Sequence, residues 1–192
     1  QIGDTFLTYK RRTAEGLVYL ALFTASSPLA NWLVQHVGTV CVPNGPCLIP
    51  VAPGIRAPSA VLVVGLAFVL RDLVQRRLGV GFAAVAVIVG AALSALLAPP
   101  SLVIASGVAF LVSEFADLAV YTPLQKRRLV LAVVASSIVG LIVDSIIFLQ
   151  LAFGSLDHLL GQILGKGWMV LLAIPFIMWI RARDERLGIE PA

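Results

Sequence analysis

Four ionisable side chains lie inside stretches of the sequence that are otherwise apolar. They are Glu114, Asp117, Asp144 and Lys166, and each is flanked by runs of Val, Leu, Ile, Ala and Phe. A charged side chain at the centre of a bilayer costs at least roughly 2.5 to 3.5 kcal/mol, so such residues are rare. We therefore expect these four side chains to bind a solute, to carry a proton or to hold helices together.

The spacing of these residues predicts polar helix faces. Glu114, Asp117 and Tyr121 follow one another at intervals of three and four, as residues on one face of a helix do. Two later stretches carry similar stripes, and these are formed by Ser136, Gly140 and Asp144 and by Gln162 and Lys166. Polar stripes in lipid must face other helices, so we expect the three stripes to enclose a polar, partly charged cavity.

A purely structural role is the main alternative. Lys166 could pair with one acid while the other acids are hydrogen-bonded between helices. Three acids against one lysine, however, leave one or two carboxylates either protonated or available to a cationic or donor-rich ligand. A transport or binding site is therefore the favoured interpretation.

Two further positions are candidates on weaker grounds. Arg71 and its neighbour Asp72 stand at the predicted cytoplasmic end of a helix, as a gate, a local ion pair or an interfacial anchor. Asn31 lies near the backbone carbonyl that Pro28 would free, so it is either a ligand contact or part of a bend.

The elements that must position these residues are membrane-spanning helices. Of the 192 residues, 59% are hydrophobic and 12% are charged, whereas about a quarter are charged in soluble domains. A spanning helix needs roughly 20 apolar residues, so the chain holds about six spans and no separate soluble domain. We predict a single all-α integral membrane domain over residues 1–192, with apolar runs at 16–37, 59–73, 82–98, 102–121, 129–153 and 159–180. The second run is short unless it continues to Leu78.

Basic residues stand before the first run, after the second, between the fourth and fifth, and after the sixth. All of the 14 Lys and Arg except Arg56 and Lys166 therefore fall on one side of the membrane. The positive-inside rule makes that side the cytoplasm and places both termini there. Basic clusters in this arrangement are a topology signal, so we expect membrane lipid and not nucleic acid around the chain.

The sequence contains no complete phosphate-binding or metal-binding motif. The stretch from Gly161 to Gly167 resembles a phosphate-binding loop, but Leu160 replaces its first Gly and Gly167 replaces the Ser or Thr that holds magnesium. Gly161 and Gly165 instead predict a small-residue face for close helix packing. Neither histidine has Cys or Glu at metal-binding spacing. We expect no enzyme activity, no metal and no cofactor.

Cys41 and Cys47 bracket a turn-rich Val-Pro-Asn-Gly-Pro segment. They are either two free thiols or, if the segment faces an oxidising compartment, a small loop disulfide.

The sequence Ser-Glu-Phe-Ala-Asp-Leu-Ala-Val-Tyr-Thr-Pro-Leu at 113–124 resembles the signature of the queuosine-precursor transporter family, also called the putative vitamin uptake transporter (VUT) family. The resemblance spans nearly the whole chain, because further segments fit in order. These segments are 30–32, 70–73 with Gly79, Ser136 to Ser145 with Phe148, and Gly165-Lys166.

The resemblance implies a six-helix importer of the bacterial inner membrane without a partner ATPase. Its expected solutes are 7-deazaguanine precursors of modified tRNA bases, such as preQ0 and preQ1. One departure concerns Ser137, since relatives often carry an amide near this position, so the substrate can differ.

A guanine-like edge suits the polar residues, since Glu114 or Asp117 could accept its paired N–H donors. Trp32, Tyr121 or Phe148 could stack on the ring. A 7-aminomethyl cation would suit Asp144 or Asp117.

The first hypothesis is therefore a secondary transporter of a purine-like solute. Glu114 and Asp117 would be its principal ligands and Asp144 and Lys166 secondary or coupling residues, with Arg71, Asn31, Tyr121 and Gln162 completing the site. The alternatives are a solute-binding membrane subunit of the vitamin-capture type, which needs a separate energising complex, and a structural membrane protein without a solute. Proton coupling and a homo-oligomeric state stay open.

Overall fold

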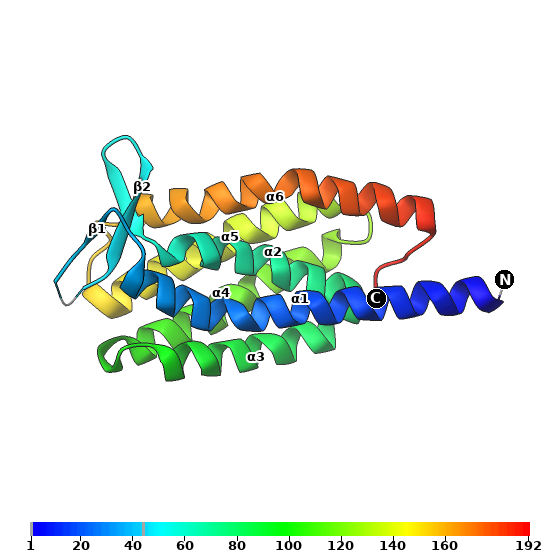
Figure 1. Cartoon of the computed structure of the whole chain (residues 1–192), viewed down its shortest axis with the longest axis horizontal. Helices are drawn as coiled ribbons and strands as arrows, with labels where there is room; N and C mark the ends of the chain where they lie inside the picture. The colour runs from blue at the N-terminus through cyan, green and yellow to red at the C-terminus, as the bar shows by residue number, and fades with distance from the viewer. Residues whose placement is uncertain (1, 44) are drawn as a thin grey trace.

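A computed structural model describes residues 2–43 and 45–192, with side chains from Thr8 onward. Six long helices form a bundle, and a small sheet caps one of its ends (Figure 1). The helices are α1 (Ile2–His36), α2 (Ala60–Leu78), α3 (Val80–Leu97), α4 (Val103–Leu124), α5 (Leu129–Phe153) and α6 (Leu159–Leu187). A short 3₁₀ turn, Pro100–Leu102, joins α3 to α4. The all-α class predicted from composition is therefore confirmed.

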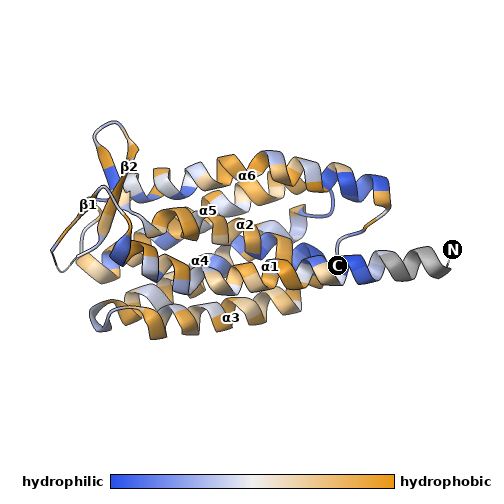
Figure 2. Cartoon of the chain, viewed as in Figure 1, coloured by the Kyte–Doolittle hydropathy of each residue, from blue (hydrophilic) through white to orange (hydrophobic). Residues whose placement is uncertain are grey.

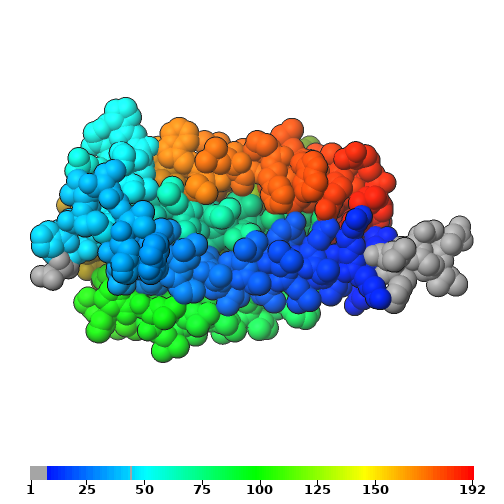
Figure 3. Space-filling view, viewed as in Figure 1, coloured from blue at the N-terminus to red at the C-terminus, as the bar shows by residue number. Residues whose placement is uncertain are grey.

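The helices run alternately up and down, so each end of the bundle gathers one set of connections. The sheet lies at one end, and the C-terminus and the first turns of α1 lie at the other (Figure 1). We call these the sheet end and the arginine-rich end, because hydrophilic residues gather at the latter while apolar residues cover the length of the bundle (Figure 2). On the face seen in Figure 3, α2 shows only as a strip between α1 and α6.

Within the described residues, five helices are long and apolar enough to cross a membrane, and α2 is the exception among the six. Its 19 residues would extend about 28 Å at 1.5 Å per residue, close to the thickness of the hydrocarbon core. It carries Arg71, Asp72, Arg76 and Arg77, which lower its mean hydropathy. All four side chains are buried, so α2 is the charged centre of the bundle surrounded by more apolar helices.

The predicted runs locate all six helices, with errors at their ends. α5 has the predicted bounds, because a cationic turn precedes it and Gly154 in a left-handed conformation ends it. α1 begins well before residue 16, and α6 continues past residue 180 to Leu187. α2 continues to Leu78, as the length of a span requires. Polar residues beyond the lipid do not stop a helix, so hydropathy alone marks the ends poorly.

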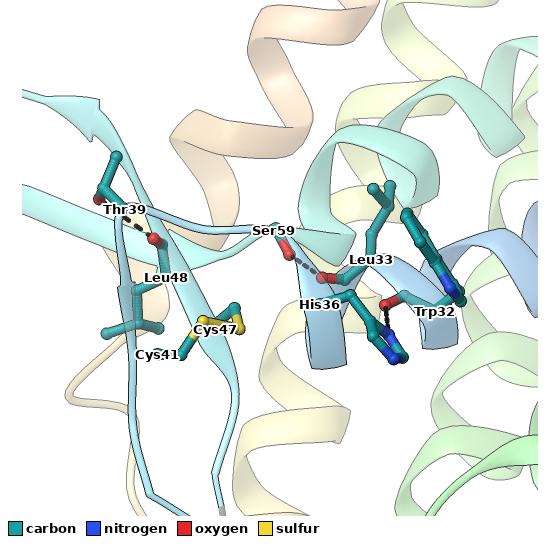
Figure 4. The surroundings of a disulfide bond; sticks show 8 residues. All are labelled: Trp32, Leu33, His36, Thr39, Cys41, Cys47, Leu48 and Ser59. Atoms are coloured by element: carbon teal, nitrogen blue, oxygen red, sulfur yellow. Dashed lines mark hydrogen bonds between the residues drawn. A yellow bond between two sulfur atoms is a disulfide. The ribbon is translucent and has the colours of Figure 1, made fainter.

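The sheet between α1 and α2 is absent from the sequence-based prediction. It contains β1 (Val40–Cys41), β2 (Cys47–Ala52) and β3 (Ile55–Pro58), paired antiparallel in that order. Cys41 and Cys47 are opposite each other in the sheet and form a disulfide (Figure 4). Ser59 attaches the sheet to α1, since its hydroxyl donates to the Leu33 carbonyl at 2.8 Å (Figure 4).

Glycines bring α6 close to α2 and to the sheet. Gly161 faces the carbonyl of Arg56 in β3, and Gly165 faces Val61 of α2, as the predicted small-residue face requires. On α2, Gly65 lies against the backbone of Lys166. The Nε1 of Trp168 adds a hydrogen bond of 2.8 Å to the carbonyl of Val51 in β2. The sheet, α2 and the first half of α6 are therefore packed closely together, with direct contact to a backbone at Gly65 and Gly161.

Gly65→Ala should destabilise the fold. The added Cβ would lie 2.8 Å from the Lys166 Cα and closer still to its carbonyl oxygen, so two helix backbones must separate. Overpacking of this kind costs about 1–3 kcal/mol. We expect a lower thermal unfolding midpoint in detergent. Gly167→Ala on α6 is the matched control, because its Cβ meets nothing within 4 Å, and equal midpoints for the two variants would contradict the prediction.

Candidate functional site

Arg71 lies at the centre of a buried cluster of charges between α2 and α4. Its Nη2 lies 2.6 Å from Asp72 Oδ1 and forms a second ion pair with Asp117 Oδ1. Its Nε lies 3.4 Å from Glu114 Oε2. All four side chains are at most 1% exposed. We call Arg71, Asp72, Glu114 and Asp117 the central charge cluster.

This position of Arg71 bears on two expectations. Arg71 and Asp72 form the local ion pair that was one of the predicted alternatives, but they do not anchor the end of a helix, because α2 continues past them to Leu78. Lys166 is also not the only cation available to the acids, since Glu114 and Asp117 contact Arg71 instead. The physical reason is that arginine can satisfy several carboxylates at once with its five N–H donors, which makes it suited to a buried position.

Neutral side chains hold the cluster in place. Arg71 Nη1 donates to Gln75 Oε1 at 2.9 Å, and Gln75 Nε2 donates to Thr122 Oγ1 at 2.9 Å. From α5, the Ser136 hydroxyl donates to Asp72 Oδ2 at 3.0 Å. Gly140 of α5 permits this approach, because a Cβ there would lie 2.7 Å from the Phe68 ring and 3.1 Å from Asp117 Cβ. Three helices therefore fix the geometry of the cluster.

Lys166 and Asp144 form a second buried group, which we call the lysine pair. Lys166 Nζ donates to Asp144 Oδ2 at 2.6 Å, to Ser145 Oγ at 2.8 Å and to Gln162 Oε1 at 2.7 Å. An ammonium has three donors, so all of them are used. The Ser113 hydroxyl reaches Asp144 Oδ1 at 3.4 Å and joins the pair to α4. Asp144 of the predicted α5 stripe therefore faces the α6 stripe, whereas Ser136 and Gly140 of the same stripe face α2 and α4.

The two groups together contain more acid than base. Four carboxylates, those of Asp72, Glu114, Asp117 and Asp144, face two cations, those of Arg71 and Lys166. Two buried negative charges are thus uncompensated unless they bind protons or a ligand with donors. Among the described residues, Asp117 Oδ2 and the Tyr121 hydroxyl have no hydrogen-bond partner although both are buried. The arrangement can accept N–H groups or exchange protons.

The side chains of the central charge cluster touch one another instead of lining an open cavity. The expected polar cavity is therefore closed in this structure, with Arg71 in the position where a ligand could satisfy the same acids. Tyr121 borders it, since the guanidinium of Arg71 lies 5.5 Å from the centre of the Tyr121 ring. A cation over an aromatic face is a favourable contact.

The other predicted contacts lie apart from this cluster. Asn31 is half-buried on α1 and donates to the carbonyl of Ser27 at 3.0 Å, and none of its described contacts reaches the central charge cluster. Trp32 is 52% exposed and stacks on His36 (Figure 4). Phe148 packs edge-on against Phe153. These three positions of the sequence-based site are not brought together with the rest.

A third charged group joins α1, α2 and α6 at the arginine-rich end. Asp184 accepts two hydrogen bonds of 2.8 Å from Arg77 and one of 3.0 Å from Arg76 Nε. Glu15 accepts hydrogen bonds from Arg77 and Arg183. From the sequence, these arginines are expected only to set the topology. The signal that it missed is the acid on α6, Asp184, whose side chain is 1% exposed.

The structure is that of a multi-pass membrane protein with charged residues enclosed among apolar helices. Residues 96–180 match the model of a family described as putative vitamin uptake transporter. The match confirms the predicted resemblance to this family over these residues. It covers α4, α5 and most of α6, and so contains Glu114, Asp117, Asp144 and Lys166, whereas Arg71 lies outside it. No curated protein and no solved structure matches the chain.

Proposed function

We propose that the protein is a secondary transporter that imports a purine-like solute across the bacterial inner membrane. The proposed solute is a queuosine precursor, a 7-deazaguanine such as preQ0 or preQ1. The observation that carries the proposal is the central charge cluster, in which a buried guanidinium is held against three carboxylates. A transporter needs such groups within the membrane to replace the water that a polar solute gives up.

The groups of the cluster are complementary to a guanine-like edge. That edge presents two neighbouring N–H donors beside a carbonyl acceptor. The carboxylate of Glu114 or Asp117 can accept the two donors, and Arg71 can donate to the carbonyl. The contact of Arg71 with Glu114, at 3.4 Å, is a long one that a ligand could replace. Asp117 Oδ2 has no partner to lose.

The lysine pair has a supporting role in this proposal. Asp144 is already held by Lys166, so a cationic 7-aminomethyl group is better placed at Glu114 or Asp117. Gln162 holds Lys166 in turn. The excess of two carboxylates supports coupling to protons, because a carboxylate that is neutralised on one side of the membrane and released on the other can carry a proton across.

We propose six spans with both termini in the cytoplasm. The arginine-rich end would then face the cytoplasm in agreement with the positive-inside rule. The disulfide between Cys41 and Cys47 supports the same orientation, since it lies at the opposite end and disulfides persist in oxidising compartments.

The test is uptake of labelled preQ1 by cells that lack their own synthesis and express this chain alone. We expect uptake by the wild type and its loss in Asp117→Asn, since the amide replaces a carboxylate oxygen by a donor. Asp157→Asn, the same chemical change at an exposed position between α5 and α6, is the matched control and should keep uptake. No uptake at normal expression would overturn the proposal. Binding by the purified protein without uptake would assign a solute-capture subunit instead.

A further inference from the structure

The polar face of α4 continues beyond the central charge cluster toward the arginine-rich end. Asp117, Tyr121 and Gln125 succeed one another at intervals of four, so they lie above one another on successive turns. All three are buried, with exposed fractions of 0%, 0% and 4%. From Asp117 to Gln125 the helix rises about 12 Å.

Each of these residues has a buried polar atom without a hydrogen-bond partner among the described residues. The atoms are Asp117 Oδ2, the Tyr121 hydroxyl oxygen and Gln125 Oε1. Buried polar groups are nearly always paired, so three in a row on one helix face call for an explanation. All three can accept a hydrogen bond, which is the chemistry that a solute with N–H donors requires.

We call Asp117, Tyr121 and Gln125 the polar column. It ends in a cavity of about 240 Å³ at the arginine-rich end. Gln125 is part of its wall, together with the ends of α2 and α6, the α4–α5 connection and the C-terminal residues. The other lining residues are Arg76, Lys126, Arg127, Leu129, Arg181, Asp184, Glu185, Gly188, Ile189, Glu190 and Pro191.

Tyr121 joins the cluster to this cavity. Its ring borders Arg71, and Tyr121 lies close enough to Arg71, Asp72, Arg76 and Arg77 to interact with all four electrostatically. Arg76 itself lines the cavity. A polar route along α4 therefore connects the buried charges with the arginine-rich surface.

We infer that the solute leaves the central charge cluster along this column, with Tyr121 and Gln125 as successive hydrogen-bonding contacts. The inference rests on the proposed transport function. Two sets of contacts close the route: the bond from Gln75 to Thr122, and the contact of Arg76 with Asp184. The C-terminal segment covers the same place, since the amide of Ala192 donates to the carbonyl of Arg76 at 3.0 Å.

Cysteine labelling tests the route without background, because the two native cysteines are joined in the disulfide. Single variants Gln125→Cys and Tyr121→Cys would be treated with a membrane-impermeant maleimide, in intact cells and in inside-out vesicles. Arg186→Cys, at an exposed position of α6 outside the cavity lining, reports which face is the arginine-rich one. Ala119→Cys lies on the exposed face of α4 and is the control for lipid-facing positions.

We expect Gln125→Cys and Tyr121→Cys to be labelled from the same face as Arg186→Cys, with Tyr121→Cys slower, and Ala119→Cys to stay unlabelled. Labelling of Gln125→Cys should abolish its uptake of preQ1, whereas labelled Arg186→Cys should keep uptake. The inference is overturned if labelled Gln125→Cys transports normally, or if Tyr121→Cys is reached only from the opposite face. Labelling of Tyr121→Cys needs no solute, so a route that exists is distinguishable from a wrong choice of solute.

Discussion

Arg71→Met is expected to leave the protein far less stable than the wild type. The substitution keeps a long side chain but removes the cation that contacts Asp72, Glu114 and Asp117, all of them buried. Removing one partner of a buried ion pair costs about 3–5 kcal/mol, because the remaining charge has neither water nor a counter-ion. The measurement is the thermal unfolding midpoint of the purified protein in detergent.

Two further variants serve as controls for this result. Arg181→Met removes an arginine whose partner Glu185 is 64% exposed, and an exposed pair of this kind contributes about 0–1 kcal/mol. Asp117→Asn added to Arg71→Met should restore part of the lost stability, since one uncompensated charge disappears. If Arg71→Met were as stable as Arg181→Met, the assignment of Arg71 as the cation of the cluster would be wrong.

Glu114→Gln is expected to abolish binding of preQ1 while the protein stays folded. The amide has nearly the same size as the carboxylate, and the contact that it alters, with Arg71 at 3.4 Å, is a long one. It presents an NH₂ group, however, where the solute's paired donors need a second acceptor, so bound donors would face a donor. Isothermal titration of the purified variant gives the affinity, and its unfolding midpoint gives the stability.

The matched control is Asp157→Asn, also a change of carboxylate to amide but at an exposed position between α5 and α6, which should bind as the wild type does. Wild-type affinity in Glu114→Gln would remove Glu114 from the site. Lost affinity together with a collapsed unfolding midpoint would make Glu114 a structural residue, which is the alternative that the sequence left open.

Hydropathy predicts most of this fold because each helix that crosses lipid needs a run of roughly 20 apolar residues. It locates α3 to α6 well, since no charge interrupts α3 and the charges inside α4, α5 and α6 are isolated within long apolar stretches. It underestimates α2, where Arg71 and Asp72 break the apolar pattern. It misses the sheet, because Pro46, Pro50, Pro53 and Pro58 suggest a loop, and pairing at the bundle end depends on contacts that are remote in sequence.

The sequence predicts which site residues share a face of one helix, but not which residues of different helices contact each other. Periodicity places Glu114, Asp117 and Tyr121 on one face of α4, and Gln162 beside Lys166 on α6. It cannot show which cation each acid meets, because that depends on the rotation of α2 against α4. Pairing of Lys166 with one acid is confirmed by its contact with Asp144, but the sequence does not reveal that Arg71 is the cation for Glu114 and Asp117. The predicted bend at Asn31 does not bring that residue to the cluster.

The close packing of glycines has a mechanical consequence. Gly65 and Gly165 bring α2 and α6 into direct contact, and Gly161 and Trp168 tie α6 to the sheet, so these parts can neither slide nor separate without losing several contacts together. They should move as one rigid body. The flexible boundary is then the one between that body and the α4–α5 hairpin, which is bridged by ion pairs and hydrogen bonds that water or a solute can replace. Rocking of the hairpin against the rigid body would expose the same acids that hold the two parts together.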